Sequence, residues 1–157
     1  MKLAPFPFAL NVGTDIVHLP RIIRLINRPA SQNSQGNAYL NRFTRRILCD
    51  QEQNAFRVRF GDLDGCGEKR SPTQTTEIAR WLAGRFASKE AAKKAAPGGA
   101  AAVGWKDVMV RVESNGSGRP EVIYLKEGGS RGELGKLSIS HDGDYVIATV
   151  IAASPNG

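Results

Sequence analysis

The chain has 157 residues, of which 41% are hydrophobic, and a formal net charge of +7. This length fits one domain with a real core and leaves little room for a second. No apolar run approaches the length of a membrane span, so we expect a soluble protein without a membrane partner. Cys49 and Cys66 lack zinc-finger or C-x-x-C spacing and accompany no secretory signal, which favours reduced thiols in an intracellular protein.

The positive charge is concentrated in the first part of the chain. Residues 1–60 contain nine Lys or Arg and three acidic residues, whereas residues 61–157 contain thirteen and twelve. Between His18 and Leu48 there are six arginines and no acid. Such a surface attracts an anionic partner, whether a nucleic acid, a membrane face or an acidic protein. A solvated surface without a partner is the alternative.

The first half of the chain is predicted to be mainly helical. A strand is expected from about Phe8 to Val12, interrupted by Gly13 and closing on Asp15. "PRIIRLIN" has helical spacing with Pro20 in its first turn, and helical character resumes in "LNRFTRRILCDQEQNAFRVRF". The polar segments "RPASQNSQGN" and "GDLDGCGEKRSPTQ" are predicted loops. A long helix from about Thr76 to Ala96 is ended by "PGG".

The second half has the pattern of strands. From Trp105 onward, four segments are predicted to be extended: "DVMVRVES", "PEVIYL", "KLSISH" and "YVIATVIA". The turns "NGSGRP" and "HDGD" contain Asn-Gly and Asp-Gly, which are strong hairpin signals. One strand, then helices, then a run of strands predicts an α+β fold.

The long helix carries a carboxylate where its pattern calls for a core residue. Ile78, Leu82 and Phe86 recur at i, i+4 spacing, and the next position is Glu90. One explanation is that the stripe meets solvent there and Glu90 pairs with Lys94 at i+4. The other is that Glu90 points into a cleft to hold a cation, with the lysines near an anionic ligand.

Two more polar residues stand at positions that a strand would fill with core residues. Asp15 follows Gly13, and His141 ends "LSISH". Each has a simple explanation alone, as a turn residue and as a strand-end histidine. Asp15 and Glu90 on two different elements suit Mg²⁺, which keeps waters and completes its shell with substrate phosphates. With Lys94 beside them, such a site would suit a pyrophosphate.

Four segments together resemble a known family. "VGTDIVHLPRI", "RFTRRIL", "WLAGRFASKEAAKKA" and "LSISHDGDYVIATVIA" are similar, in order and spacing, to the holo-acyl-carrier-protein synthase family of 4'-phosphopantetheinyl transferases, from about Asn11 to Ala152. The resemblance implies one α+β domain in which a long helix packs against an antiparallel sheet. It also implies Mg²⁺-dependent transfer of the phosphopantetheine arm from coenzyme A to a serine of an acyl carrier protein, with release of adenosine 3',5'-bisphosphate.

The resemblance also assigns roles to residues. Asp15 and Glu90 match the metal ligands and, with Lys94, the catalytic residues. Glu90 or a metal-bound water is the candidate base for the serine proton. Coenzyme A is expected to contact Lys94, Lys89, Gly118, Pro120, Ser140 and His141, with "SGRP" near the adenine. The acidic carrier helix is expected to dock on Arg21, Arg42, Phe43 and Arg46.

Some features depart from the family pattern. "NRPASQNSQGN" and "GDLDGCGEKRSPTQ" look like loop insertions, near residues 28–40 and 61–75, and "APGGAAAVG" replaces the usual glycine-rich turn. The resemblance implies a stand-alone homotrimer with sites between subunits. The loops and "LNVGTDI" look most like fungal organellar members, so we expect the mitochondrial matrix, or else the cytoplasm. The N-terminal "MKLAPFPFAL" fits neither a secretory signal nor an Arg-rich presequence.

Two other functions compete with this one. A nucleic-acid-binding module would want aromatic residues among the basic ones for stacking, and Tyr39 and Phe43 are a thin set, so we expect no nucleic-acid partner. A silent scaffold that only binds carrier protein is disfavoured because Asp15, Glu90 and Lys94 are all present.

Overall fold

The computed structural model describes residues 1, 3, 6–28, 37–61, 70–114 and 116–154. Its centre is one five-stranded antiparallel sheet with the strand order β1-β5-β4-β3-β2. The strands are β1 (Leu10–His18), β2 (Val108–Val112), β3 (Pro120–Lys126), β4 (Arg131–Asp142) and β5 (Tyr145–Ala153). The helices are α1 (Leu19–Ile26), α2 (Ala38–Ile47), α3 (Asp50–Phe60) and α4 (Pro72–Ala95). Short 3₁₀ turns occupy Ala100–Ala102, Trp105–Asp107 and Glu127–Gly129.

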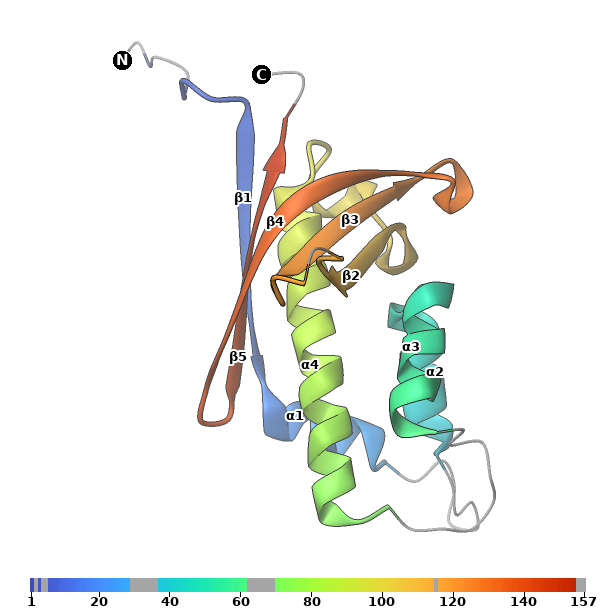
Figure 1. The fold of residues 1–157 in the computed structure, drawn as a ribbon. Coiled ribbons are helices and arrows are strands. Elements are labelled where there is room, and N and C mark those ends of the chain that lie inside the picture. The colour runs from blue at the N-terminus through green and yellow to red at the C-terminus, as the bar shows by residue number, and fades with distance from the viewer. Residues whose placement is uncertain (2, 4–5, 29–36, 62–69, 115, 155–157) are drawn as a thin grey trace.

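The long helix α4 packs along β1 and β5 on one face of the sheet (Figure 1). Ser71 caps it by accepting a hydrogen bond from the amide of Gln74, and Pro72 occupies its first turn, where no amide hydrogen is needed. Its buried face is rich in alanine, which brings the helix close to the sheet; the fully buried alanines are Ala79, Ala83, Ala87, Ala91, Ala92 and Ala95.

Gly13 lies where β1 and α4 approach most closely. A Cβ atom added there would overlap the carbonyl oxygen of Ala91 and come within 2.8 Å of the amide nitrogen of Ala95. The strand can therefore pass the helix at this separation only with glycine at this position. This contact also explains why the predicted interruption at Gly13 was wrong: β1 runs without a break from Leu10 to His18.

The helices α1, α2 and α3 pack beside α4 and complete the core. The predicted helical segment after residue 40 is two helices, because Leu48 and Cys49 are extended and a new helix begins at Asp50. The long helix begins at Pro72, four residues before the predicted start, and ends as predicted before the glycine pair. The four predicted strands after Trp105 are confirmed, and so is the α+β class.

The other face of the sheet is not covered by the described helices. Strand alternation turns Val12 and Ile16 of β1, and Ile147 and Ile151 of β5, away from α4, and their exposures are 39–66%. We call these four residues the outer sheet face; the register places Val12 beside Ile151 and Ile16 beside Ile147. The two predicted loop insertions fall largely on residues 29–36 and 62–69, outside the described part. Among the described residues, no helix combines the length and apolar character that a bilayer span requires.

Candidate active site

Asp15 meets α4 beside the Gly13 contact. Asp15 is two residues after Gly13, so strand alternation turns both toward the helix. The Nζ atom of Lys94 donates to Asp15 Oδ1 at 3.0 Å and to the Thr14 carbonyl at 2.8 Å. The Lys94 side chain is 46% exposed, so this pair is open to solvent and to a ligand.

Glu90 lies one helical turn before Lys94. Its carboxylate pairs with Lys93 at 3.1 Å, and the Lys93 ammonium lies 4.7 Å from the centre of the Trp105 ring. The pairing of Glu90 with Lys94, expected if the stripe simply met solvent, is not found, because Lys94 is directed to Asp15. The structure thus gives two carboxylates, each paired with one lysine of α4: Asp15 with Lys94 where β1 meets the helix, and Glu90 with Lys93 one helical turn earlier.

These four charges suit a cation bound together with an anion. Carboxylate oxygens are hard ligands, and the two lysines are donors for phosphate oxygens. Within the described part of the chain, no cluster of three or more His, Cys, Asp or Glu side chains could hold a metal alone. Asp15 and Glu90 can therefore supply two ligands, and water and a substrate must supply the others.

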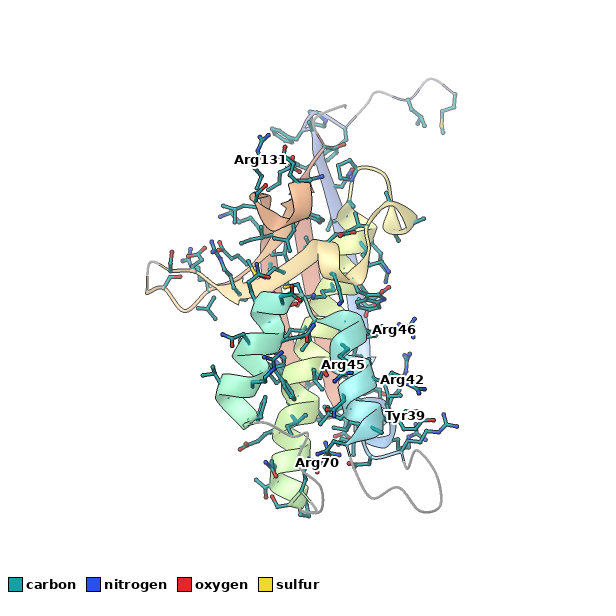
Figure 2. All side chains as sticks on the ribbon, turned by 90° about the vertical axis from the view of Figure 1, so that its right-hand side faces the viewer. Tyr39, Arg42, Arg45, Arg46, Arg70 and Arg131 are labelled. Carbon is teal, nitrogen blue, oxygen red and sulfur yellow. The ribbon has the colours of Figure 1, made fainter. Side chains whose placement is uncertain are left out.

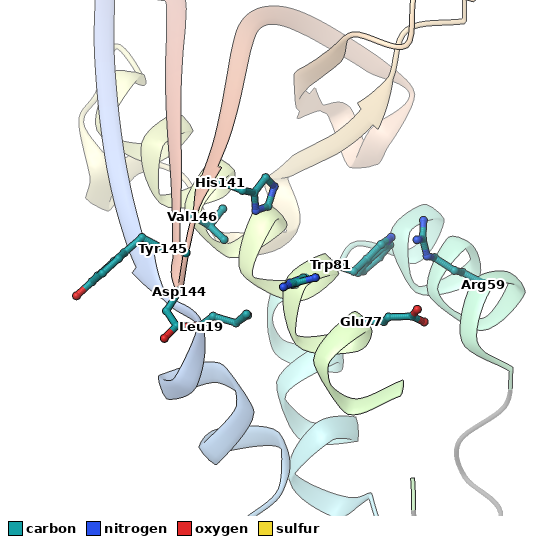
Figure 3. A pocket seen from close by; sticks show the side chains of 10 residues that line it. Leu19, Arg59, Glu77, Trp81, His141, Asp144, Tyr145 and Val146 are labelled. Carbon is teal, nitrogen blue, oxygen red and sulfur yellow. The ribbon is translucent and has the colours of Figure 1, made fainter. Parts of the chain in front are cut away.

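His141 lies in a different place. It lines a cavity of about 600 Å³ at the β4–β5 turn, together with Leu19, Arg59, Glu77, Arg80, Trp81, Gly143, Asp144, Tyr145 and Val146 (Figure 3). Asp15, Glu90 and Lys94 do not line it. Trp81 supports the guanidinium of Arg85, which lies 3.2 Å from its ring centre. The structure therefore does not bring His141 to the carboxylates within one chain.

The sequence analysis missed the other polar residues of this cavity. Arg59 comes from α3, and Glu77 and Arg80 come from the first half of α4. The spacing Glu77, Trp81, Arg85 is i, i+4, which indicates one helix face. Only the fold brings that face to His141.

The predicted adenine turn borders another cavity, of about 370 Å³. Pro120 and Arg119 line it together with Glu113, Lys136, Leu137, Ser138 and Ile139. Gly118 has φ of 70°, a conformation that favours glycine. Ser140 is exposed on β4, two residues beyond Ser138. Lys136 is a cation at this cavity that the motif did not indicate.

Lys89 does not fit the prediction that it contacts coenzyme A. Its side chain is 0% exposed, and its ammonium donates to the carbonyls of Ile47 (2.7 Å) and Trp105 (2.9 Å) and pairs with Glu52 (2.5 Å). Burial lowers the pKa of Lys89, and the charge of Glu52 opposes that shift. All three ammonium hydrogens have protein acceptors, so we correct this prediction and treat Lys89 as a structural cation.

The predicted docking residues divide into two groups. Arg21, Arg42 and Arg46 are exposed on α1 and α2, and Arg45 adds another exposed cation to α2 (Figure 2). Phe43 is only 8% exposed and lies 6.0 Å from Phe86, ring centre to ring centre. Phe43 therefore packs α2 against α4 and does not present a surface to a partner.

An α+β fold with two carboxylate–lysine pairs within one turn of the same helix suits an enzyme that acts on a phosphate ester. The sequence profile of the 4'-phosphopantetheinyl transferase superfamily matches residues 11–150. The chain therefore belongs to the 4'-phosphopantetheinyl transferase superfamily.

Individual relatives agree with this assignment. The chain is 58% identical to the mitochondrial 4'-phosphopantetheinyl transferase B of Aspergillus fumigatus, over 98% of this chain and 99% of that protein. It is 36% identical to the holo-[acyl-carrier-protein] synthase of Chlamydia pneumoniae, over 91% and 96%. The solved structure of the Bacillus anthracis holo-(acyl-carrier-protein) synthase in complex with CoA (3',5'-ADP) is similar with a TM-score of 0.58 and 29% identity, over 92% of this chain and 96% of that one.

Proposed function

We propose that this protein transfers the 4'-phosphopantetheine arm of coenzyme A to a serine of an apo acyl carrier protein, with Mg²⁺ as its cofactor and adenosine 3',5'-bisphosphate as the released product. The observation that carries the proposal is the contact of Asp15 with Lys94, one helical turn from Glu90, in a chain of this superfamily. The acceptor class follows from the relatives, whose names include holo-[acyl-carrier-protein] synthases.

The residues fit a divalent cation and a pyrophosphate. Asp15 and Glu90 are 18% and 24% exposed, so their oxygens are reachable, and a cation would replace the two lysines as their partner. Bound there with the pyrophosphate, Mg²⁺ would neutralise charge on the transferring phosphorus and the leaving group. Lys94, released from Asp15, is placed to donate to a phosphate oxygen. Glu90 is a candidate acceptor for the proton of the carrier serine.

The exposed arginines of α1 and α2 suit an acidic carrier protein. Arg21 of α1 and Phe43 of α2 both contact the ring of Phe86, which lies one helical turn before Glu90, and Arg42 and Arg46 lie on α2 beside Phe43. A carrier bound on these arginines would present its serine close to the two carboxylates. Steering by such a surface raises the association rate and makes it sensitive to salt.

We further propose a homotrimer whose sites lie between subunits. The outer sheet face is a row of exposed aliphatic side chains, of the kind that an interface covers. His141 and the carboxylates lie apart within one chain, so a neighbouring subunit would complete the coenzyme site, including Ser140 and the Gly118–Pro120 turn. The similarity to a mitochondrial relative supports the mitochondrial matrix as the location.

The activity is tested by incubating the protein with coenzyme A, Mg²⁺ and an apo acyl carrier protein. Intact-protein mass spectrometry should show the added arm on the carrier, and no addition when Mg²⁺ is chelated. A carrier that stays unmodified in the presence of Mg²⁺ would reject the proposal.

The shared site is tested by mixing two inactive variants, Glu90→Ala and His141→Ala. Some mixed trimers contain one interface with both residues intact, so part of the activity should return. Subunit exchange is shown first, by tagging one variant and recovering the other with it. Exchange without recovered activity would mean that each site is complete within one chain.

A further inference from the structure

A buried ion pair, Lys89–Glu52, lies where α2 ends and α3 begins. The last carbonyls of a helix have no partner within it, and a cation near them is favourable. The ammonium of Lys89, on α4, donates to the carbonyl of Ile47, the last residue of α2, at 2.7 Å. A side chain of the central helix thus caps α2.

Glu52 supplies the opposite charge at the start of α3. Its carboxylate accepts from the amide of Cys49 at 3.1 Å and from the amide of Val110, in β2, at 3.0 Å. A negative charge is favourable at a helix N-terminus. Lys89 and Glu52 are 0% and 2% exposed and lie 2.5 Å apart, so the pair connects α2, α3, α4 and β2 without contact with solvent.

The pair is also next to the proposed metal ligand. Lys89 precedes Glu90 in α4, and its ammonium also donates to the carbonyl of Trp105, whose ring contacts Lys93, the partner of Glu90. A displacement of Lys89 would therefore change the position of the Glu90 carboxylate, both through the backbone of α4 and through the contact of Trp105 with Lys93.

We propose that Lys89 and Glu52 are positioning residues that fix the carrier-docking helix α2 relative to Glu90. This inference rests on the proposed function, because it concerns where a carrier bound to Arg42 and Arg46 places its serine. Burying two charges is unfavourable compared with burying apolar side chains, so stability alone gives no reason for an ion pair here. Directed bonds to Ile47 and Trp105 do fix a geometry, and small displacements of reacting groups slow a reaction strongly.

The test separates positioning from stability with the double variant Glu52→Gln/Lys89→Met. It removes both charges of the Lys89–Glu52 pair, so the bond to Ile47 is lost. Arg85, whose Nε lies 3.9 Å from Glu52, loses that carboxylate but is 19% exposed and keeps its contact with the Trp81 ring, so the protein should fold. We expect kcat for the apo carrier to fall about 10–100-fold. The KM for the carrier and the Kd for coenzyme A should stay within about twofold, because Arg42, Arg46 and Lys94 are unchanged. The comparison variant Arg42→Ala should instead raise the KM for the carrier.

Each other outcome has a defined meaning. A folded double variant with unchanged kcat overturns the proposal. A loss of coenzyme A affinity as large as the loss of kcat also overturns it, because Lys89 would then act in binding coenzyme A. If the double variant does not fold, Glu52→Gln/Lys89→Leu, which also removes both charges of the pair and the bond to Ile47, is subject to the same comparison. Amide hydrogen exchange needs no substrate: it should be faster along α2 (Ala38–Ile47) in the variant, and unchanged exchange overturns the proposal. If the unmodified protein transfers nothing, the proposed function fails and the exchange result still decides this inference.

Discussion

Lys89 and Glu90 are consecutive residues of α4, and their side chains lie in opposite environments. Lys89 points to the side of α2, α3 and β2, where it is completely buried with Glu52. Glu90 points to the side with Lys93 and Trp105, where it is 24% exposed. A rotation of about 100° per residue separates the two sides of a helix.

The two sides use charge differently. On the exposed side, the pairs Glu90–Lys93 and Asp15–Lys94 can separate at little cost, because water can solvate each partner. On the buried side, Glu52 and Lys89 have no access to water, so neither can lose the other cheaply. The exposed pairs can therefore exchange a partner for a ligand, whereas the buried Lys89–Glu52 pair keeps the helices around it in a fixed arrangement.

The largest expected effect is on the exposed side. Asp15→Ala and Glu90→Ala should each lower the transfer rate by about a thousandfold or more, because each would remove a proposed metal ligand, and such a ligand contributes several kcal/mol in the transition state. The free energy of unfolding should change by only about 0.5 kcal/mol, since each carboxylate is paired near the surface. Transfer is measured by mass spectrometry and stability by denaturant unfolding. Full activity in Glu90→Ala would contradict the proposal that Glu90 is a metal ligand.

The same substitution on both sides gives the most direct comparison. Lys89→Met removes the close partner of Glu52 and leaves it only Arg85, whose Nε lies 3.9 Å away, so the free energy of unfolding should fall by about 3 kcal/mol. Lys94→Met, whose side chain is half-exposed, should cost less than about 1 kcal/mol while reducing the use of coenzyme A. Calorimetry and urea unfolding measure both. Equal stability losses would contradict the division between the two sides.

A smaller effect is expected for carrier docking. Arg21→Ala and Arg46→Ala should each weaken carrier binding about fivefold at low salt, corresponding to a loss of roughly 1 kcal/mol per surface charge. The effect should shrink as ionic strength rises. Arg131, which is exposed and lies far from α2, is the matched control, and Arg131→Ala should leave binding unchanged (Figure 2). A carrier affinity indifferent to salt and to these mutations would mean that this surface faces another partner.

The smallest effect concerns Tyr124, whose hydroxyl donates to the carbonyl of Ala92 at 2.8 Å. Tyr124→Phe should cost about 1 kcal/mol at neutral pH. Burial raises the pKa of Tyr124 from 10.0 to about 12, so the unfolded chain loses this proton first. The stabilisation is complete below pH 10 and is lost as pH rises toward 12. The stability difference between the two proteins, measured by urea unfolding, should therefore shrink over that range; a constant difference would contradict the assignment.

Strands with alternating apolar residues were predictable because alternation is a local property. The strands after Trp105 and the turns between them follow directly from it. The two candidate metal ligands could also be picked out from the sequence, because a carboxylate at a position that the local pattern assigns to the core is unusual in any fold.

Features that depend on distant residues were not predictable. Gly13 weakens a strand locally, and only the approach of α4 shows why β1 continues through it. Lys89 shares a motif with Glu90 and Lys94, and the motif does not reveal that Ile47, Trp105 and Glu52 converge on it. Phe43 stands among arginines in the sequence, and its burial depends on Phe86, more than forty residues away.

The contact at Gly13 bears on how the site could be redesigned. The separation of β1 from α4 is set by main-chain atoms at Gly13, Ala91 and Ala95, and no side chain at position 15 takes part in it. Residue 15, a proposed metal ligand, therefore projects from a backbone whose position does not depend on its own side chain. Exchanging Asp15 for Asn changes the charge of the donor and exchanging it for His changes its charge and hardness, while the backbone position stays the same, so the metal preference of such variants reports the chemistry of one donor.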